Sequence, residues 1–277
     1  MTEGTRGRRA GLAPSGGGAR TSPVGVEVDG VSMTYALDGG KTLQALDRVN
    51  LNVSAAEFCS IVGPSGCGKS TLLMLIAGLF RPGTGRILVD QRPVAGPWQG
   101  VGMVFQRDLL LEWRTVLGNV LLPVEVKRRP PAPYQERARA LLDLVGLGEF
   151  AASYPDQLSG GMRQRVAICR ALIDDPPLLL MDEPFASVDA LTREKLNTDL
   201  LALTRESPKT VLFVTHSIEE AVLLADQVAV MGPRPGAIRR VFPVNIPRPR
   251  GIGTRNDPRF VALVDQIRAT FHTMGLL

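Results

Sequence analysis

The sequence predicts an α/β fold in which a parallel sheet is covered by helices, with an antiparallel β subdomain before it and an α-helical subdomain inserted into it. The parallel core is indicated by Leu178–Met181 and Val211–Val214, two wholly apolar runs of strand length that suit strands buried on both faces. Val24–Val31 and Leu46–Val53 instead alternate apolar and polar residues, as half-buried strands do. Helical patterning dominates from about 107 to 158.

The first half of the chain places strands and turns in a clear order. Asp38–Gly40 is a turn signal between the two alternating runs. Phe58–Val62 is a compact apolar strand that leads through a glycine-rich loop into a helical run from Lys69 to Leu79. Arg86–Val89 and Val101–Phe105 are predicted as further short strands.

The second half begins with helices and ends with one. Pro130–Pro133 divides the helical region, because proline interrupts a helix, and Glu136–Val145 has one apolar helical face. Val228–Met231 is predicted as the last core strand, and Pro243–Pro249 as a proline-rich connector. Asp257-Pro258 predicts an N-cap and first helical residue for the final helix.

The sequence shows no internal repeat, and its elements predict a single copy of the fold in three parts. Residues 1–23 are expected to be a disordered basic tail, since they hold four arginines against one glutamate and no apolar segment of a signal peptide. Residues 24–240 are predicted to form the main domain, with the helical subdomain inserted at about 107–158. Residues 241–277 are the predicted C-terminal connector and helix.

Composition excludes several classes of protein. A hydrophobic fraction of 44% in 277 residues allows a sizeable core, but no run approaches the roughly 18–20 apolar residues of a membrane span. The net charge of +5 is low and partly confined to the tail, whereas nucleic-acid binding favours a dense basic patch. Cys59, Cys67 and Cys169 show no CxxC spacing, so we expect buried hydrophobes and not a zinc or redox site.

Gly63–Ser70 matches the phosphate-loop pattern GxxxxGK[ST] between an apolar strand and a helix. Glycines let successive N–H groups turn inward around phosphate oxygens, and the helix directs its positive end at the same point. Lys69 is predicted to reach the β- and γ-phosphates, and the Ser70 hydroxyl to bind Mg²⁺. The expected ATP-binding residues here are Gly63, Pro64, Ser65, Gly66, Cys67, Gly68, Lys69, Ser70 and Thr71.

The apolar run at 178–181 ends in Asp182-Glu183. Alone this is a weak signal, since many strands end in an acid, but after a phosphate loop it is strong. Asp182 is predicted to hold Mg²⁺, as P-loop ATPases require. Glu183 would then lie beside the γ-phosphate, where a carboxylate can orient or deprotonate the attacking water.

Leu158–Gln164 reads Leu-Ser-Gly-Gly-Met-Arg-Gln and resembles the signature motif of the ABC ATPase family. Ser159 can cap a helix that continues to about Ile173. Gly160 and Gly161 would leave the helix N-terminus open to a phosphate. The resemblance implies the P-loop (RecA-like) core of an ABC nucleotide-binding domain.

The remaining motifs of that family follow in order. Phe105-Gln106 resembles the Q-loop, Ser187–Asp189 the D-loop, and His216 the switch histidine, although a capping histidine is the plainer alternative. Tyr35 resembles the aromatic residue that stacks on adenine, with an ordinary strand tyrosine as the alternative. The resemblance implies ATP and Mg²⁺ as cofactors, with these sets: catalytic Glu183, His216 and Gln106; metal-binding Ser70, Gln106 and Asp182; nucleotide-contacting Tyr35, Ser159, Gly160, Gly161 and Asp189.

Several stretches look closest to ATPases of the nitrate/sulfonate/taurine type of importer. They are Gly100–Gln106, Trp113–Leu117, Asp189–Glu194, Phe213–Ile218, Pro247–Gly251 and Asp257–Phe260. One departure is Ala186-Ser-Val-Asp189, where relatives commonly have Gly-Ala-Leu-Asp. The resemblance implies an ATP-hydrolysing subunit of an importer for a small solute, with an ABC exporter subunit as the alternative.

The resemblance also implies partners. Two copies would pair head to tail, with each ATP between the phosphate loop of one and Ser159–Gly161 of the other. Two permease subunits would dock at Arg107–Thr115, and this chain would lie at the cytoplasmic face of the bacterial inner membrane. A periplasmic or lipid-anchored substrate-binding protein would be an indirect partner, reached through the permease. Leu109–Leu111 and Trp113 either face the permease or pack inside the insertion.

Two other classes compete with a transporter. Soluble ABC ATPases of DNA repair, chromosome organisation or translation usually carry two ATPase copies, zinc insertions or coiled coils, none of which is visible. P-loop kinases and GTPases have no reason to hold Leu158–Gln164. No nucleic-acid partner is expected. The cargo is not encoded, because the ATPase does not touch it.

Overall fold

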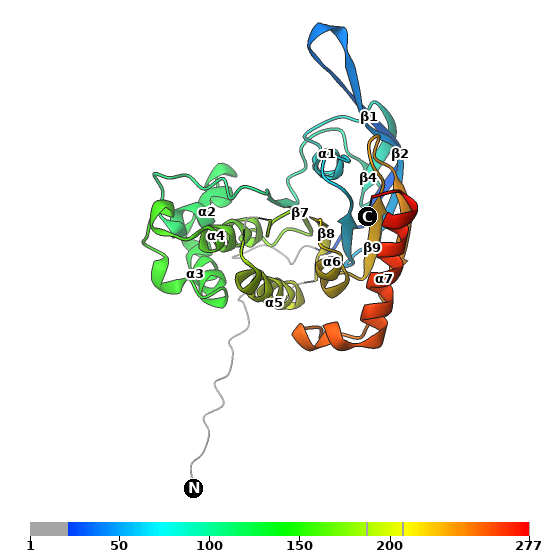
Figure 1. Ribbon diagram of the computed structural model, residues 1–277. Coiled ribbons are helices and arrows are strands. Elements are labelled where there is room, and N and C mark those ends of the chain that lie inside the picture. The colour runs from blue at the N-terminus through cyan, green and yellow to red at the C-terminus, as the bar shows by residue number, and fades with distance from the viewer. Residues whose placement is uncertain (1–21, 187, 207, 277) are drawn as a thin grey trace.

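The computed structural model describes residues 22–186, 188–206 and 208–276. The predicted disordered tail, 1–23, lies outside these residues except for its last two. Within the described part, two β-sheets pack together with helices around them (Figure 1). The predicted fold class, an α/β core with an antiparallel β subdomain and a helical insertion, is confirmed.

The larger sheet has the strand order β10-β9-β3-β8-β7-β6. Its strands are β3 (Phe58–Val62), β6 (Val101–Val104), β7 (Leu178–Asp182), β8 (Thr210–Thr215), β9 (Gln227–Met231) and β10 (Ile238–Pro243). All pairs are parallel except β9 with β10. Every residue of β3, β7 and β8 is buried, which is why nearly all of their residues are apolar.

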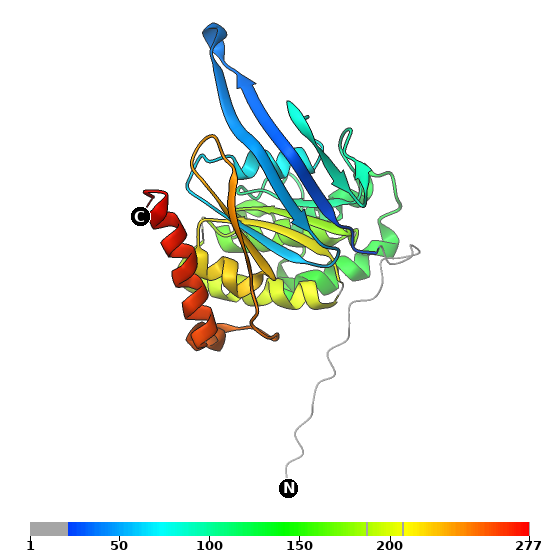
Figure 2. The same cartoon turned by 90° about the vertical axis from the view of Figure 1, so that its right-hand side faces the viewer.

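The smaller sheet is antiparallel, with the order β2-β1-β4-β5. Its strands are β1 (Val26–Ala36), β2 (Thr42–Val53), β4 (Thr84–Val89) and β5 (Arg92–Pro93). The predicted turn at Asp38–Gly40 joins β1 and β2 as a short 3-10 helix. These two strands are longer than predicted and form a hairpin that projects beyond the body of the molecule (Figure 2), which carries Tyr35 to the outer part of β1.

The helical insertion lies at one side of the molecule (Figure 1). It contains α2 (Val116–Val126) and α3 (Gln135–Leu144), and it packs with α4 (Gly160–Leu172). Thr115 and Ser159 cap α2 and α4 through their hydroxyls. The predicted break at Pro130–Pro133 separates α2 from α3.

The remaining helices cover the two faces of the larger sheet. They are α1 (Lys69–Ile76), α5 (Ala190–Glu206), α6 (Ile218–Leu224) and α7 (Pro258–Thr273). Phe58 and Val62 of β3 belong to the core cluster that α7 joins, whereas Cys59 and Ile61 point into the cluster of α1 and the smaller sheet. Helix α7 lies against α6, so the last predicted helix closes one side of the core.

Three sequence predictions need correction. The helix predicted at 69–79 ends at Ile76, because Gly78 has φ +74 and a Cβ there would lie 2.0 Å from the Gly96 carbonyl oxygen. Val228–Met231 is not the last strand, since β10 follows it as an antiparallel edge strand. The strand predicted at 101–105 ends one residue earlier, at Val104. The predicted domain boundaries stay predictions.

No helix in the described part of the chain is both long and apolar enough to cross a membrane.

Candidate active site

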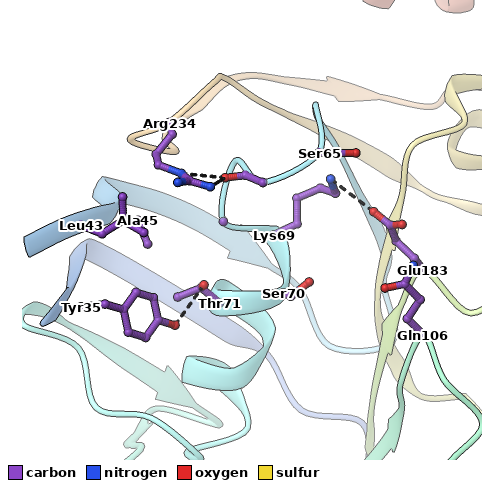
Figure 3. Close-up of a pocket in the computed structure, with 12 residues that line it drawn as sticks. Tyr35, Leu43, Ala45, Ser65, Lys69, Ser70, Thr71, Gln106, Glu183 and Arg234 are labelled. Carbon is purple, nitrogen blue, oxygen red and sulfur yellow. Dashed lines mark hydrogen bonds and ion pairs between the residues drawn. The ribbon is translucent and has the colours of Figure 1, made fainter. Parts of the chain in front are cut away.

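A polar cavity of about 340 Å³ lies where α1 begins, between the smaller sheet and the end of β7. Its two ends differ: Tyr35, Leu43 and Ala45 lie at one, and Gln106 and Glu183 at the other (Figure 3). The lining residues are Tyr35, Leu43, Ala45, Ser65, Gly66, Gly68, Lys69, Ser70, Thr71, Gln106, Glu183 and Arg234.

The predicted phosphate loop leads from β3 into α1, and two of its glycines are required by geometry. Gly68 has φ +105, and a Cβ there would lie 2.6 Å from Leu46 Cδ2 and 2.9 Å from the Ala45 carbonyl oxygen. A Cβ at Gly63 would lie 2.8 Å from the Met231 carbonyl oxygen. The loop is therefore wedged between β2 and β9, and only glycine allows this approach.

Lys69 is the buried cation of the loop, with a side chain only 4% exposed. Its Nζ donates to the carbonyls of Gly63 at 3.0 Å and Pro64 at 3.1 Å, and lies 3.4 Å from Glu183 Oε1. A buried ammonium needs such partners. The side chain is thus held across the mouth of the loop, facing the carboxylate (Figure 3).

Ser70 and Asp182 form the second polar pair. The Ser70 hydroxyl donates to Asp182 Oδ1 at 2.9 Å. Asp182 is 7% exposed, and burial raises the pKa of its carboxyl against the lowering effect of the Ser70 hydrogen bond. A buried carboxylate that is short of compensating charge, beside a hydroxyl oxygen, offers the hard oxygen donors that Mg²⁺ prefers.

Gln106 lines the same cavity, so the residues predicted to bind metal fit such an ion. Within the described residues, no cluster of three or more His, Cys, Asp or Glu side chains gathers to hold a metal. A cation here would therefore draw its remaining ligands from phosphate oxygens and water.

Glu183 and His216 meet at the ends of the neighbouring strands β7 and β8. His216 Nδ1 lies 3.6 Å from Glu183 Oε2, and the histidine side chain is half exposed. Glu183 has φ 44, a left-handed conformation that is uncommon for a non-glycine residue, and its N–H donates to the Val214 carbonyl. Such backbone strain is concentrated at functional sites, and here it aims the carboxylate between Lys69 and His216.

Tyr35 is fixed at the opposite end of the cavity. Its hydroxyl lies 3.2 Å from Thr71 Oγ1. Its ring meets Phe80 edge to face, with centroids 6.1 Å apart. Phe80 was not predicted from the sequence, because one aromatic residue just after a helix is no signal. The Tyr35 ring therefore has a defined orientation beside the cavity.

The remaining predicted residues lie apart from this cavity. Ser159 Oγ accepts from the Met162 N–H at the start of α4, and Asp189 Oδ1 accepts from the Thr192 N–H. Ser159, Gly160 and Asp189 are exposed, and Gly161 packs against Thr192. None of them lines the cavity, so these residues form a second exposed surface. Ser187 of the predicted D-loop lies outside the described residues.

The sequence did not predict three of the lining residues, Leu43, Ala45 and Arg234, and Arg234 was missed for a structural reason. Arg234 is in the β9–β10 loop, 168 residues from Gly66 in the chain, and its side chain donates to the Gly66 carbonyl from Nε at 3.0 Å and Nη2 at 2.8 Å. No local pattern marks it, since only the pairing of β9 beside β3 brings it to the loop.

Comparisons with known proteins agree with this site. The family described as ABC transporter matches residues 46–186. The chain is 47% identical over 227 residues to an uncharacterized ABC transporter ATP-binding protein of Methanocaldococcus jannaschii, covering 82% of this chain and 85% of that protein. It is 46% identical over 258 residues to the taurine import ATP-binding protein TauB of Rhizobium johnstonii, covering 90% of this chain and 97% of that protein.

Solved structures match as well. The ATP-binding cassette MJ0796, solved as a dimer in a post-hydrolysis state bound to ADP and Pi, is 36% identical with a TM-score of 0.70, and the match covers 80% of this chain and 99% of that one. Together with the phosphate loop, the Ser70–Asp182 pair and Glu183, these similarities identify the chain as an ATP-binding ATPase. The chain therefore belongs to the ABC transporter family.

Proposed function

We propose that this chain is the ATP-hydrolysing subunit of an importer that takes up a small solute of the nitrate, sulfonate or taurine type through separate permease subunits. The observation that carries the proposal is the similarity to taurine import ATP-binding proteins, one of which it matches over 90% of the chain at 46% identity. The ATPase cavity is consistent with it, because Lys69, the Ser70–Asp182 pair and Glu183 line or flank one space.

The residue roles follow from the cavity. The N–H groups of the phosphate loop would hold the phosphates, with Lys69 Nζ on the β- and γ-oxygens. Tyr35, at the far end, would stack on adenine. Ser70, Gln106 and Asp182 would hold Mg²⁺, which when bound neutralises phosphate charge.

Hydrolysis would depend on Glu183 and His216. Glu183 Oε1 and Oε2 face Lys69 and His216 respectively. A carboxylate in that position accepts a proton from, or orients, the water that attacks the γ-phosphate. His216 would hold the Glu183 carboxylate and the phosphate in register.

The separate surface of Ser159–Gly161 and Asp189 would complete the site of a second copy. The α4 N-terminus is exposed, and it offers N–H donors and the positive end of the helix. Two copies arranged head to tail would each hold ATP between one phosphate loop and the partner's α4. The dimeric MJ0796 cassette supports this arrangement.

Permease docking would use residues 107–115. Leu109 and Trp113 are 52% and 75% exposed, so these two side chains are not packed inside the insertion, whereas Leu110 packs partly against the core. Asn119 fixes the segment by hydrogen bonds to Leu111 N and O. An exposed apolar segment whose backbone is held by hydrogen bonds is suited to a protein interface. The complex would sit at the cytoplasmic face of a bacterial inner membrane.

The test is a pull-down of the tagged chain from membranes solubilised gently with an ATP analogue. We expect two copies of a polytopic permease and a substrate-binding protein to co-purify. Trp113→Ala should lose the permease, whereas Val261→Ala, which alters an apolar side chain 49% exposed on α7, should retain it. A permease without any binding protein would favour an exporter, and a soluble or nucleic-acid partner alone would contradict the transporter.

The cargo can then be named through the companion protein. Titration of the co-purified binding protein with nitrate, alkanesulfonates, taurine and pyrimidines should give saturable binding of one class. If nitrate, alkanesulfonates and taurine all failed to bind, the proposed solute type would be wrong. The assignment of the chain as an ATPase would still stand.

A further inference from the structure

Arg234 binds the backbone of the phosphate loop through its guanidinium group. Its Nε and Nη2 both donate to the Gly66 carbonyl oxygen, at 3.0 and 2.8 Å, and the side chain lies at the rim of the cavity (Figure 3). Gly66 has φ +75, and a Cβ there would lie 2.9 Å from Arg234 Nη2. Glycine is therefore needed at position 66 both for the backbone and for this contact.

The contact fixes the direction of one peptide group. The Gly66–Cys67 bond is not among the cis bonds of the described residues, and in a trans peptide the carbonyl and the N–H point in opposite directions. Because Arg234 holds the Gly66 oxygen outward, the Cys67 N–H points into the loop. Its hydrogen bond there, to the Pro64 carbonyl, is long at 3.4 Å, so this N–H can be taken over by a phosphate oxygen.

The loop that carries Arg234 is itself fixed. The Gly236 N–H donates to the Ala45 carbonyl, and the Asp47 N–H to the Gly236 carbonyl, both at 2.9 Å. A Cβ at Gly236 would lie 1.9 Å from the Cys67 carbonyl oxygen. The β9–β10 loop is thus packed onto both β2 and the phosphate loop, which places the guanidinium before any ligand arrives.

We propose that Arg234 is a positioning residue for nucleotide binding, which acts through the Gly66–Cys67 peptide. Two donors from a cation polarise the Gly66 carbonyl, and that polarisation strengthens the Cys67 N–H as a donor toward phosphate. The same contact keeps the peptide from rotating. The inference rests on the proposed role of the loop, and it adds a residue from a distant hairpin to that role.

The test compares Arg234→Gln with Arg240→Gln in the full chain. Arg240 is an exposed arginine of the neighbouring β10 that lies over the Phe242 ring, so its loss removes the same charge without touching the loop. We expect R234Q to weaken Mg-ADP binding about three- to tenfold, the net size of an ordinary hydrogen bond, and to raise KM for ATP more than it lowers kcat. R240Q should bind as the wild type does. Unchanged affinity in R234Q, or equal weakening in R240Q, would overturn the proposal.

A spectroscopic readout separates positioning from mere stability. The chain has three cysteines, so selective ¹⁵N-cysteine labelling gives a three-peak amide spectrum. R234Q should move the Cys67 amide resonance of the nucleotide-free protein and leave those of Cys59 and Cys169 in place. An unmoved Cys67 resonance would contradict the mechanism.

Lys69→Ala distinguishes this inference from the role of the loop. If K69A binds Mg-ADP normally, the phosphate-loop assignment itself is wrong. If K69A loses binding while R234Q retains it fully, only the inference about Arg234 fails.

Discussion

At the scale of single residues, Glu183 lies between Lys69 and His216, with one carboxylate oxygen facing each side chain. Glu183→Gln keeps the size of the side chain but removes the charge that would accept a proton. We expect it to bind ATP and to slow hydrolysis by a factor on the order of 10²–10⁴, measured as phosphate release at saturating ATP. Turnover at the wild-type rate would remove Glu183 from its role.

Asp182 presents a conflict between stability and function. Burial raises its pKa above the ordinary 3.8, so ionisation opposes folding at every pH above that raised value. Asp182→Asn keeps an acceptor for Ser70 and removes the buried charge. It should raise the denaturation midpoint of the nucleotide-free protein while weakening Mg-ATP binding.

The pH dependence of stability tests whether the buried charge of Asp182 is the cause of this difference. As pH falls through the raised pKa and below 3.8, wild-type Asp182 is protonated in both folded and unfolded chains, so the advantage of D182N should vanish. Chemical denaturation at neutral and acid pH measures this. A gain in stability that does not depend on pH would contradict burial as its cause.

At the scale of the elements, buried strands could be predicted from the sequence more accurately than exposed ones. β3, β7 and β8 are apolar at nearly every position because both faces are covered, and their predicted bounds are confirmed or within one residue. β10 is an edge strand with outward Arg239 and Arg240, so it carried no hydrophobic pattern. The difference between these buried strands and β10 has a physical cause, since a strand that is paired on one edge and solvated on a face needs few apolar residues.

Arg250 ties the C-terminal connector to helix α6. Its guanidinium is 8% exposed and donates to the carbonyls of Val222, Ala225, Val244 and Ile246, and burial lowers its pKa to about 10. Truncation to alanine would remove the side-chain donor from the Val222 and Ala225 carbonyls at the end of α6 and from two carbonyls of the connector. Arg250→Ala should therefore reduce the free energy of unfolding by about 2–4 kcal/mol.

Chemical denaturation measures that loss, with Arg239→Ala as the control, since Arg239 is an exposed arginine outside this contact. R239A should stay within about 0.5 kcal/mol of wild type. Equal stability of R250A and R239A would show that the connector is held by other contacts.

For the whole molecule, local sequence motifs predicted most of the cavity, because the phosphate loop and Asp182-Glu183 each follow a buried strand. Strand order then brought Ser70 to Asp182 and Glu183 to His216. Arg234 depends on contacts between distant segments, which no motif encodes. The distance of Ser159–Gly161 from the cavity had to be inferred from the family resemblance.

The separation of the two surfaces gives a prediction about assembly. In an E183Q background, ATP should drive dimer formation, observed by light scattering. Adding Ser159→Arg should block the dimer by placing a bulky side chain at the α4 N-terminus, while monomers still bind ATP. Normal dimer formation in that double variant would count against a site shared between two copies.

The place of β3 in its sheet has a consequence for synthesis. β3 lies between β8 and β9, and the Phe58 N–H donates to Asp226, 168 residues later in the chain. When a nascent chain has left the ribosome only as far as α5, β3 has emerged without either neighbouring strand, and four of its five residues are apolar. Such a strand is prone to aggregate until its partners emerge. We therefore expect the folding of this protein during synthesis to depend on chaperones, which would shield β3 until β8 and β9 have been made.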